Sequence, residues 1–230
     1  MKAARRPMRL ADLARFRQAA YRLFGAALLS PDEQRFETLG AVARELEGES
    51  GRVDGFAFFP QWSRFVRALV TCRETGAPHV AEAYTRLFLV NPGGVCPPYA
   101  SHYLAPHAPA RVMAEVEQAY ARAGLAVPSS LNEPPDHISA ELEFMSLLCA
   151  EEAAAWRRRK LRDGLQRLDS EAGFLDQHLL PWFPEFSSEV AKQDGGGFYT
   201  VVTDAARAFL VHDLDLVAIL RGRCREEATR

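Results

Sequence analysis

The residues Glu133-Pro134-Pro135-Asp136-His137 run directly into a helical pattern that covers residues 138–148. We call residues 133–137 the acidic corner. Its two prolines restrict the backbone beside three titratable side chains, and Pro135 and Asp136 are typical of a helix start. The apolar residues that follow at helical spacing are Ile138, Leu142, Met145 and Leu148. This spacing predicts a helix that buries one face and holds the corner in place.

Two interpretations of the corner stay open at this point. In the first, Pro-Pro-Asp ends a loop and caps the helix, which leaves His137 on the surface. In the second, the corner is a rigid acidic binding site. The rest of the chain decides between them.

Composition bounds the class of protein. The chain has 230 residues, 48% of them hydrophobic, and a formal net charge of -2. This composition is typical of a globular protein with one large domain or two small ones. Nearly balanced charges argue against nucleic acid as the main partner, because phosphate binding needs a basic excess on some face.

The cysteines and the first residues of the chain indicate a compartment. Cys72, Cys96, Cys149 and Cys224 are widely spaced and form no CxxC pair, so neither a zinc knuckle nor a disulfide framework is indicated. Charged residues interrupt the apolar residues after Arg5-Arg6, which excludes a signal-peptide core there. We therefore expect a cytoplasmic protein without stable membrane insertion.

Apolar residues recur at helical spacing along almost the whole chain, and no alternating strand pattern with hairpin signals occurs. Helices are expected over residues 10–29, 32–46, 62–75, 80–90, 110–123, 138–160, 161–183 and 198–223, with a sharp turn of the chain at residues 181–184. The sequence thus predicts an all-α bundle of about nine helices. Two regions are expected, 1–124 and 125–230, the second beginning with the connector 125–135 that leads to the corner, unless both form one compact domain.

A proline-rich connector, residues 96–109, is rich in aromatic residues and histidines. Cys96, His102 and His107 make it the best metal candidate, and a metal-dependent enzyme is the alternative function. Their spacing matches no common zinc pattern, which favours coincidence of composition. The common phosphate-loop, nucleophile-elbow and zinc-protease motifs do not occur in the sequence, so no catalytic residue, metal or cofactor is predicted.

A binding surface is the more coherent interpretation. Apolar and aromatic area would come from Tyr84, Leu87, Phe88, Tyr99 and Tyr103, and negative charge from Glu133, Asp136 and Glu141. Such a mixture suits a peptide that has apolar side chains beside arginines, because carboxylates bind guanidinium groups in a fixed fork geometry. Leu87 and Phe88 are also expected in the core. We expect Asp136 to pair with an arginine while His137 orients the corner.

Three blocks of sequence resemble one known family. They are residues 83–88 (AYTRLF) with 97–104 (PPYASHYL), residues 133–137 (EPPDH) with 141–145 (ELEFM), and residues 174–182 (FLDQHLLPW) with Phe198-Tyr199. In order and spacing they resemble the TorD/DmsD/NarJ family of cytoplasmic chaperones for molybdenum-cofactor oxidoreductases, and most closely its TorD/DmsD-like branch.

The resemblance implies an all-helical fold and binding rather than catalysis. It implies that the chaperone binds the twin-arginine signal peptide of a molybdoenzyme catalytic subunit, and holds that subunit in the cytoplasm until its cofactor is inserted and before Tat export. Whether the body of the client is also contacted stays open. The pocket implied by position comprises Tyr84, Leu87, Phe88, Pro98, Tyr99, Ser101, Tyr103, Pro134, Asp136 and His137. A monomer or a domain-swapped dimer is expected, with the connector 125–135 as the hinge of the dimer.

Overall fold

The computed structural model describes residues 8–48, 53–75, 78–89, 94–126 and 131–228. The named elements within these residues are all helical, which confirms the predicted all-α class. The α-helices are α1 (Leu10–Ala27), α2 (Glu33–Gly48), α3 (Phe59–Thr75), α4 (Pro78–Tyr84), α5 (Ala100–Leu104), α6 (Pro109–Ala123), α7 (Ile138–Arg157), α8 (Leu161–Phe174), α9 (Phe183–Asp194) and α10 (Phe198–Ala228). Two π-helical segments, η2 (Thr85–Leu89) and η4 (Leu175–Leu179), continue α4 and α8.

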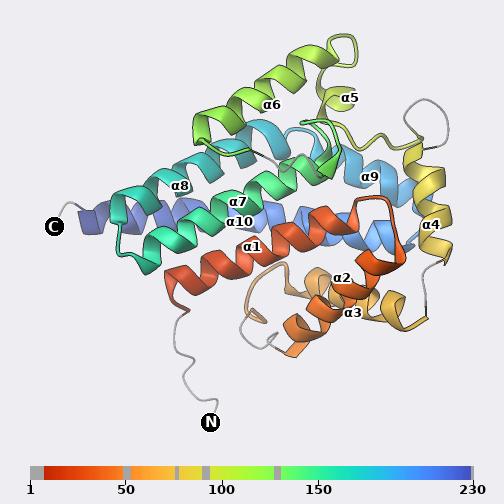
Figure 1. The fold of residues 1–230 in the computed structure, drawn as a ribbon, viewed down its shortest axis with the longest axis horizontal. Coiled ribbons are helices and arrows are strands. Elements are labelled where there is room, and N and C mark those ends of the chain that lie inside the picture. The colour runs from red at the N-terminus through yellow and green to blue at the C-terminus, as the bar shows by residue number, and fades with distance from the viewer. Residues whose placement is uncertain (1–7, 49–52, 76–77, 90–93, 127–130, 229–230) are drawn as a thin grey trace.

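Four helices form the body of the bundle. Helix α1 packs along α7, α7 along α8, and α8 along α10, so these helices lie side by side along the long axis (Figure 1). Helices α2 and α3 pack on each other beside α1 and α10, while α4, η2 and α9 cover one end. No described helix is long and apolar enough to cross a bilayer.

Aromatic rings fill the space between α1, α3 and α10. Phe24 stacks on Phe65 with ring centroids 4.7 Å apart, and Trp62 and Phe209 pack against Phe24 at 5.7 Å. Each of these side chains is almost fully buried. Burial of a large aromatic side chain stabilises a fold by roughly 1.5–3 kcal/mol, so these rings anchor three helices to one core.

Glycines end two helices where the sequence contains them. Gly124 follows α6 with a φ of 67°, and Gly195 follows α9 with a φ of 60°. Glycine adopts this left-handed conformation without the strain that a Cβ atom causes. The predicted end of the helix before Gly124 is thereby confirmed.

The structure differs from the sequence-based expectation in two places near the corner. The connector 96–109 contains a short helix, α5, where only a loop was predicted. Helix α7 begins at Ile138 with His137 as its N-cap, so Pro135 and Asp136 lie before the cap. A five-residue helix shows too little periodicity to be predicted, and the cap differs because His137 itself accepts the hydrogen bond.

One cluster of buried side chains draws on both predicted regions, including Phe24 and Leu69 before residue 125 and Leu142 and Phe209 after it. Of the connector between the regions, residues 127–130 lie outside the described part of the chain. The division at residue 125 stays a prediction.

Candidate functional site

Backbone hydrogen bonds join the acidic corner to the connector 96–109, which we call the aromatic connector. The amide of Ile138 donates to the carbonyl of Pro98 at 2.9 Å, and the amide of Ala100 donates to the carbonyl of Asp136 at 2.9 Å. Tyr99 and His137 form an isolated antiparallel bridge between these bonds. Two segments separated by more than 30 residues therefore form one rigid unit.

Asp136 has a structural partner in this unit. Its carboxylate accepts a hydrogen bond from the amide of Ser101 at 3.0 Å, and the residue is 1% exposed. The amides in the first turn of a helix lack partners within that helix, so an acceptor from another segment satisfies one of them. Asp136 thus fixes the start of α5 against the corner.

His137 caps α7 as a neutral side chain. Its Nδ1 accepts a hydrogen bond from the amide of Ser139 at 3.1 Å, and its ring packs edge-on against Tyr99 at 5.3 Å. Burial lowers the pKa of His137 to about 4, because the charged imidazolium is poorly solvated there. At neutral pH the corner therefore has no positive charge of its own from this histidine.

Glu133 is the acid of the corner that reaches solvent, with a side chain 23% exposed. Partial burial raises its pKa. Within the described residues its ion-pair partner is His137, whose Nε2 lies 3.9 Å from a carboxylate oxygen and is uncharged at neutral pH. Burial, followed by the charge of Glu133, raises the pKa of Tyr84 to about 12 and raises that of Tyr99. Glu133 thus lies close to two tyrosines, and in the described part of the chain it forms no ion pair with a lysine or arginine.

A second set of contacts holds the other side of the connector. Trp182 Nε1 donates to Glu141 at 3.2 Å, and the ring of Tyr103 stacks on Trp182 at 5.5 Å. The hydroxyl of Tyr103 donates to Glu189 at 3.0 Å. Burial raises the pKa of Glu141 well above its ordinary value. Glu141 is therefore an internal acid and not the surface charge that the sequence suggested.

The twelve predicted site residues divide by burial. Buried side chains are Tyr84, Leu87, Phe88, Pro98, Ser101, Asp136, His137 and Glu141. Those that reach solvent are Tyr99, Tyr103, Glu133 and Pro134. The expected core positions of Leu87 and Phe88 are confirmed at 0% and 3% exposure. Solvent access at this site is therefore confined to the rim formed by the corner and the connector.

The sequence pattern does not single out Trp182 or Glu189 as site residues. Trp182 lies in the FLDQHLLPW block, where the flanking Pro181 and Pro184 predict only a turn. Glu189 lies in α9 and accepts a hydrogen bond from Tyr103 of the site. Nothing in a helical pattern reveals a partner 86 residues away.

The predicted metal candidate does not assemble. Among the described residues, Cys96, His102 and His107 do not come together as a group of ligand atoms, and the group that does is Cys149, Glu152 and Glu171. Cys96 is buried, whereas His102 and His107 are exposed. Burial raises the pKa of the Cys96 thiol to about 11, which disfavours the thiolate needed by a metal ligand or a nucleophile. The metal-dependent alternative was wrong on this geometry.

Known proteins with similar sequence are chaperones. The family described as nitrate reductase delta subunit matches residues 57–188. The chaperone protein TorD of Vibrio cholerae serotype O1 is 30% identical over 171 residues, which cover 70% of this chain and 75% of that protein. The chaperone protein TorD of Photobacterium profundum is 32% identical over 142 residues, which cover 60% and 63%.

A solved structure has the same fold. It is an Archaeoglobus fulgidus protein described as a redox enzyme maturation protein, 23% identical, with a TM-score of 0.55 over 91% of this chain and 99% of that one. The sequence matches, rather than this structural likeness, show the family. The chain belongs to the nitrate reductase delta subunit family that includes the TorD chaperones, and it is a chaperone rather than an enzyme.

Proposed function

We propose that the protein binds the twin-arginine signal peptide of a molybdoenzyme catalytic subunit and keeps that subunit in the cytoplasm until its cofactor is inserted and before Tat export. The observation that carries the proposal is Glu133, a partly exposed acid beside Tyr84 and Tyr99 whose ion-pair partner among the described residues is the neutral His137. An arginine side chain supplies what this arrangement lacks.

The chemistry of guanidinium fits the rim. A carboxylate accepts two parallel hydrogen bonds from the planar fork of a guanidinium group, and the faces of aromatic rings attract a cation. Tyr99 reaches solvent and offers aromatic area beside the acid. Tyr103 also reaches solvent, and the exposed Leu89, Val95 and Leu104 add apolar surface on or near the connector 96–109. A leader that carries arginines followed by apolar residues matches both surfaces.

The buried site residues act by position in this proposal. Asp136 fixes α5, and His137 fixes α7 and bridges to Tyr99. Pro134 and Pro135 restrict the corner before a peptide arrives, which reduces the ordering cost of binding. Leu87, Phe88 and Pro98 are buried, so they do not contact a peptide from solvent.

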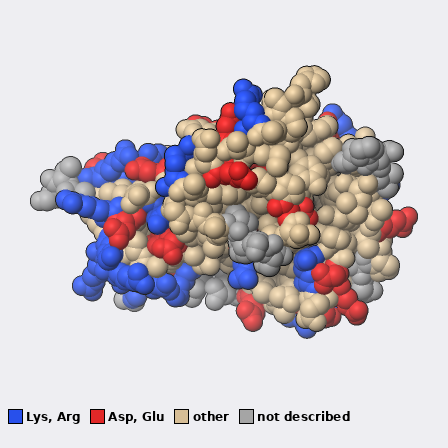
Figure 2. Space-filling view, turned by 45° about the horizontal axis from the view of Figure 1, so that its top comes forward, with Lys and Arg blue, Asp and Glu red and all other residues tan. Residues whose placement is uncertain are grey.

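The distribution of surface charge supports an arginine-binding site at a distance from the end of the molecule that is rich in Lys and Arg. Figure 2 shows Lys and Arg side chains gathered toward the end of the molecule where the C-terminus lies. The α7–α8 turn contributes an exposed basic run there, residues 157–160. A cationic leader is repelled from that end.

The test is a titration of the purified chain with leader peptides from molybdoenzymes encoded near its own gene. We expect saturable binding that is lost when both arginines of the leader become alanine. Binding no tighter than about millimolar, or about -4 kcal/mol, for every leader contradicts the proposal.

Oligomeric state bears on how many leaders are held. We infer either a monomer or a dimer that exchanges helices across residues 125–135. Light scattering at several concentrations distinguishes them, since only the dimer has twice the mass of the 25.6 kDa chain.

A further inference from the structure

A buried ionic cluster lies far from the corner, where α1, α7, α8 and α10 meet. Arg17 of α1 donates from Nε to Asp213 at 2.6 Å, from Nη1 to Glu152 at 2.7 Å and from Nη2 to Glu171 at 2.5 Å. The side chains of all four residues are at most 1% exposed. Each residue comes from a different helix, so the cluster joins the four main helices of the bundle.

The charges in the cluster do not balance. Three carboxylates face one guanidinium, and the ion pairs to them within the described residues all come from Arg17. The other polar groups that face them are neutral at neutral pH. They include Tyr21, which donates to Asp213 at 2.6 Å, and Trp156, which donates to Glu152 at 2.7 Å. They also include the thiols of Cys149 and Cys224, whose pKa values are raised by burial. With all carboxyl groups ionised, the cluster would carry two uncompensated negative charges out of reach of water, which is costly.

Hydrogen bonding singles out one carboxyl group. Asp213 accepts two bonds from Arg17 and one from Tyr21. Glu152 accepts one from Arg17 and one from Trp156. Among the described residues, Glu171 accepts only from Arg17, through Oε2, and its buried Oε1 has no partner there. Protonation of Glu171 Oε1 therefore costs the least free energy, because no hydrogen bond is lost there.

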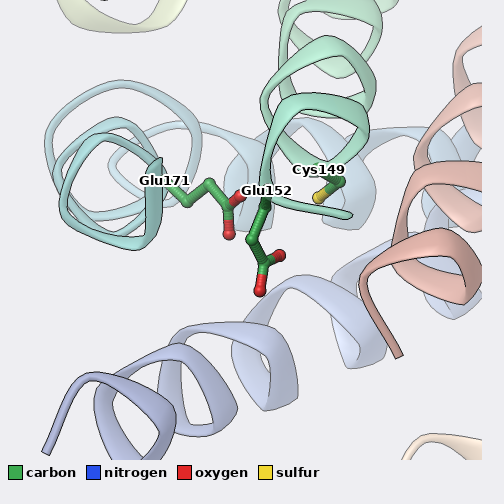
Figure 3. A group of neighbouring side chains, drawn as sticks. All are labelled: Cys149, Glu152 and Glu171. Atoms are coloured by element: carbon green, nitrogen blue, oxygen red, sulfur yellow. The ribbon is translucent and has the colours of Figure 1, made fainter. Parts of the chain in front are cut away.

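The surroundings of Glu171 also favour a proton on its carboxyl group. The side chain of Glu171 extends from α8 toward Glu152 of α7 (Figure 3). An oxygen of each and the Cys149 sulfur lie within 4.8 Å of one another. Burial raises the pKa of Glu171 to about 8; Arg17 opposes the rise and Glu152 adds to it. The Arg17 guanidinium is already the cation beside Cys149, Glu152 and Glu171. We therefore infer that these residues share a proton rather than bind a metal ion.

We propose that Glu171 carries a proton in the folded protein at neutral pH, so that docking of α8 against α1, α7 and α10 takes up one proton from solvent. In the unfolded chain the same carboxyl group titrates near 4.5. The stability that it contributes is fully present below pH 4.5 and is lost as the pH rises toward about 8. The helix packing at this end of the bundle is therefore sensitive to alkaline pH.

The test compares the unfolding of three full-length proteins in denaturant between pH 5.5 and 7.5: wild type, Glu171→Gln and Glu151→Gln. Gln is a neutral isostere of the protonated acid. One proton taken up on folding makes the unfolding equilibrium constant rise about tenfold per pH unit. We expect Glu171→Gln to lose that tenfold slope, and Glu151→Gln, which alters an exposed acid on α7, to keep it. Equal slopes in wild type and Glu171→Gln overturn the proposal.

A second measurement needs no variant. Infrared difference spectra of the wild-type protein between pH 6 and pH 9.5 should show the stretching band of a protonated, buried carboxyl group disappear in a titration centred near pH 8. Glu141, a second buried acid, is distinguished by repeating the titration with Glu141→Gln, which should keep the band of Glu171. A folded protein with no protonated carboxyl band in either form at pH 6 also overturns the proposal.

Discussion

Asp136 illustrates what sequence can and cannot reveal about a single residue. Its type and place beside two prolines predicted a rigid acidic corner, and the corner is present. The sequence contained no sign that its carboxylate is 1% exposed and bonded to Ser101, because that partner lies 35 residues away. Glu133 keeps access to solvent, which moves the proposed contact with arginine to Glu133.

Replacement of Glu133 should separate binding from stability. Glu133→Gln removes the charge while keeping the shape, and charge-assisted hydrogen bonds contribute about 1.5–3 kcal/mol, so leader binding should weaken roughly ten- to a hundred-fold. The melting temperature should not fall, because partial burial already disfavours the charged form. Peptide titration and thermal melting check the two effects. The control is Glu117→Gln, an exposed acid on α6, for which neither quantity should change.

His137 should make the fold sensitive to acid. Its folded pKa of about 4 lies below the ordinary 6.5, so the unfolded chain binds the proton more tightly, and stability is lost as the pH falls from 6.5 through 4. His137→Asn keeps a side-chain cap and does not titrate. Between pH 7 and pH 4 the wild type should lose about 3 kcal/mol more than this variant in denaturant unfolding. An equal loss would show that His137 is not held neutral by burial.

At the scale of helices, the length of each helix determined whether the sequence pattern could predict it. The long apolar stripes of α1, α7 and α10 were found because many turns repeat the same pattern. Helix α5 was missed because its five residues span little more than one turn. The π-helical segments η2 and η4 were missed because each has only five residues, which is too short to show a periodicity of its own.

Helix α5 should depend on the corner. Asp136→Ala removes the acceptor for the Ser101 amide, whereas Asp136→Asn retains an oxygen in the same place. Hydrogen exchange should therefore speed up in residues 99–104 of the alanine variant, with α10 unchanged and the asparagine variant close to wild type. Leader binding should weaken together with that loss of protection. Unchanged protection in Asp136→Ala would mean that α5 is held by other contacts.

At the scale of the whole molecule, fold class and family could be predicted because apolar periodicity and three sequence blocks extend over most of the chain. The Arg17 cluster was not predicted, although a signal for it exists. Arg17 lies at helical spacing from Leu13, Ala20 and Phe24, and Asp213 from Phe209 and Val217, so both occupy positions that the pattern assigns to the core. Charged residues at such positions indicate a buried partner, but not which helix provides it.

The central claim is that Glu133 binds a guanidinium group of the leader, and a double-mutant cycle tests it most directly. The four affinities come from wild type and Glu133→Gln, each titrated with the natural leader and with a leader whose twin arginines are lysines. Lysine keeps the charge but lacks the planar fork, so the change should weaken binding to wild type and have little effect on Glu133→Gln. A coupling energy of about 1 kcal/mol or more is the predicted result. Additive effects, within about 0.5 kcal/mol, would contradict the claim.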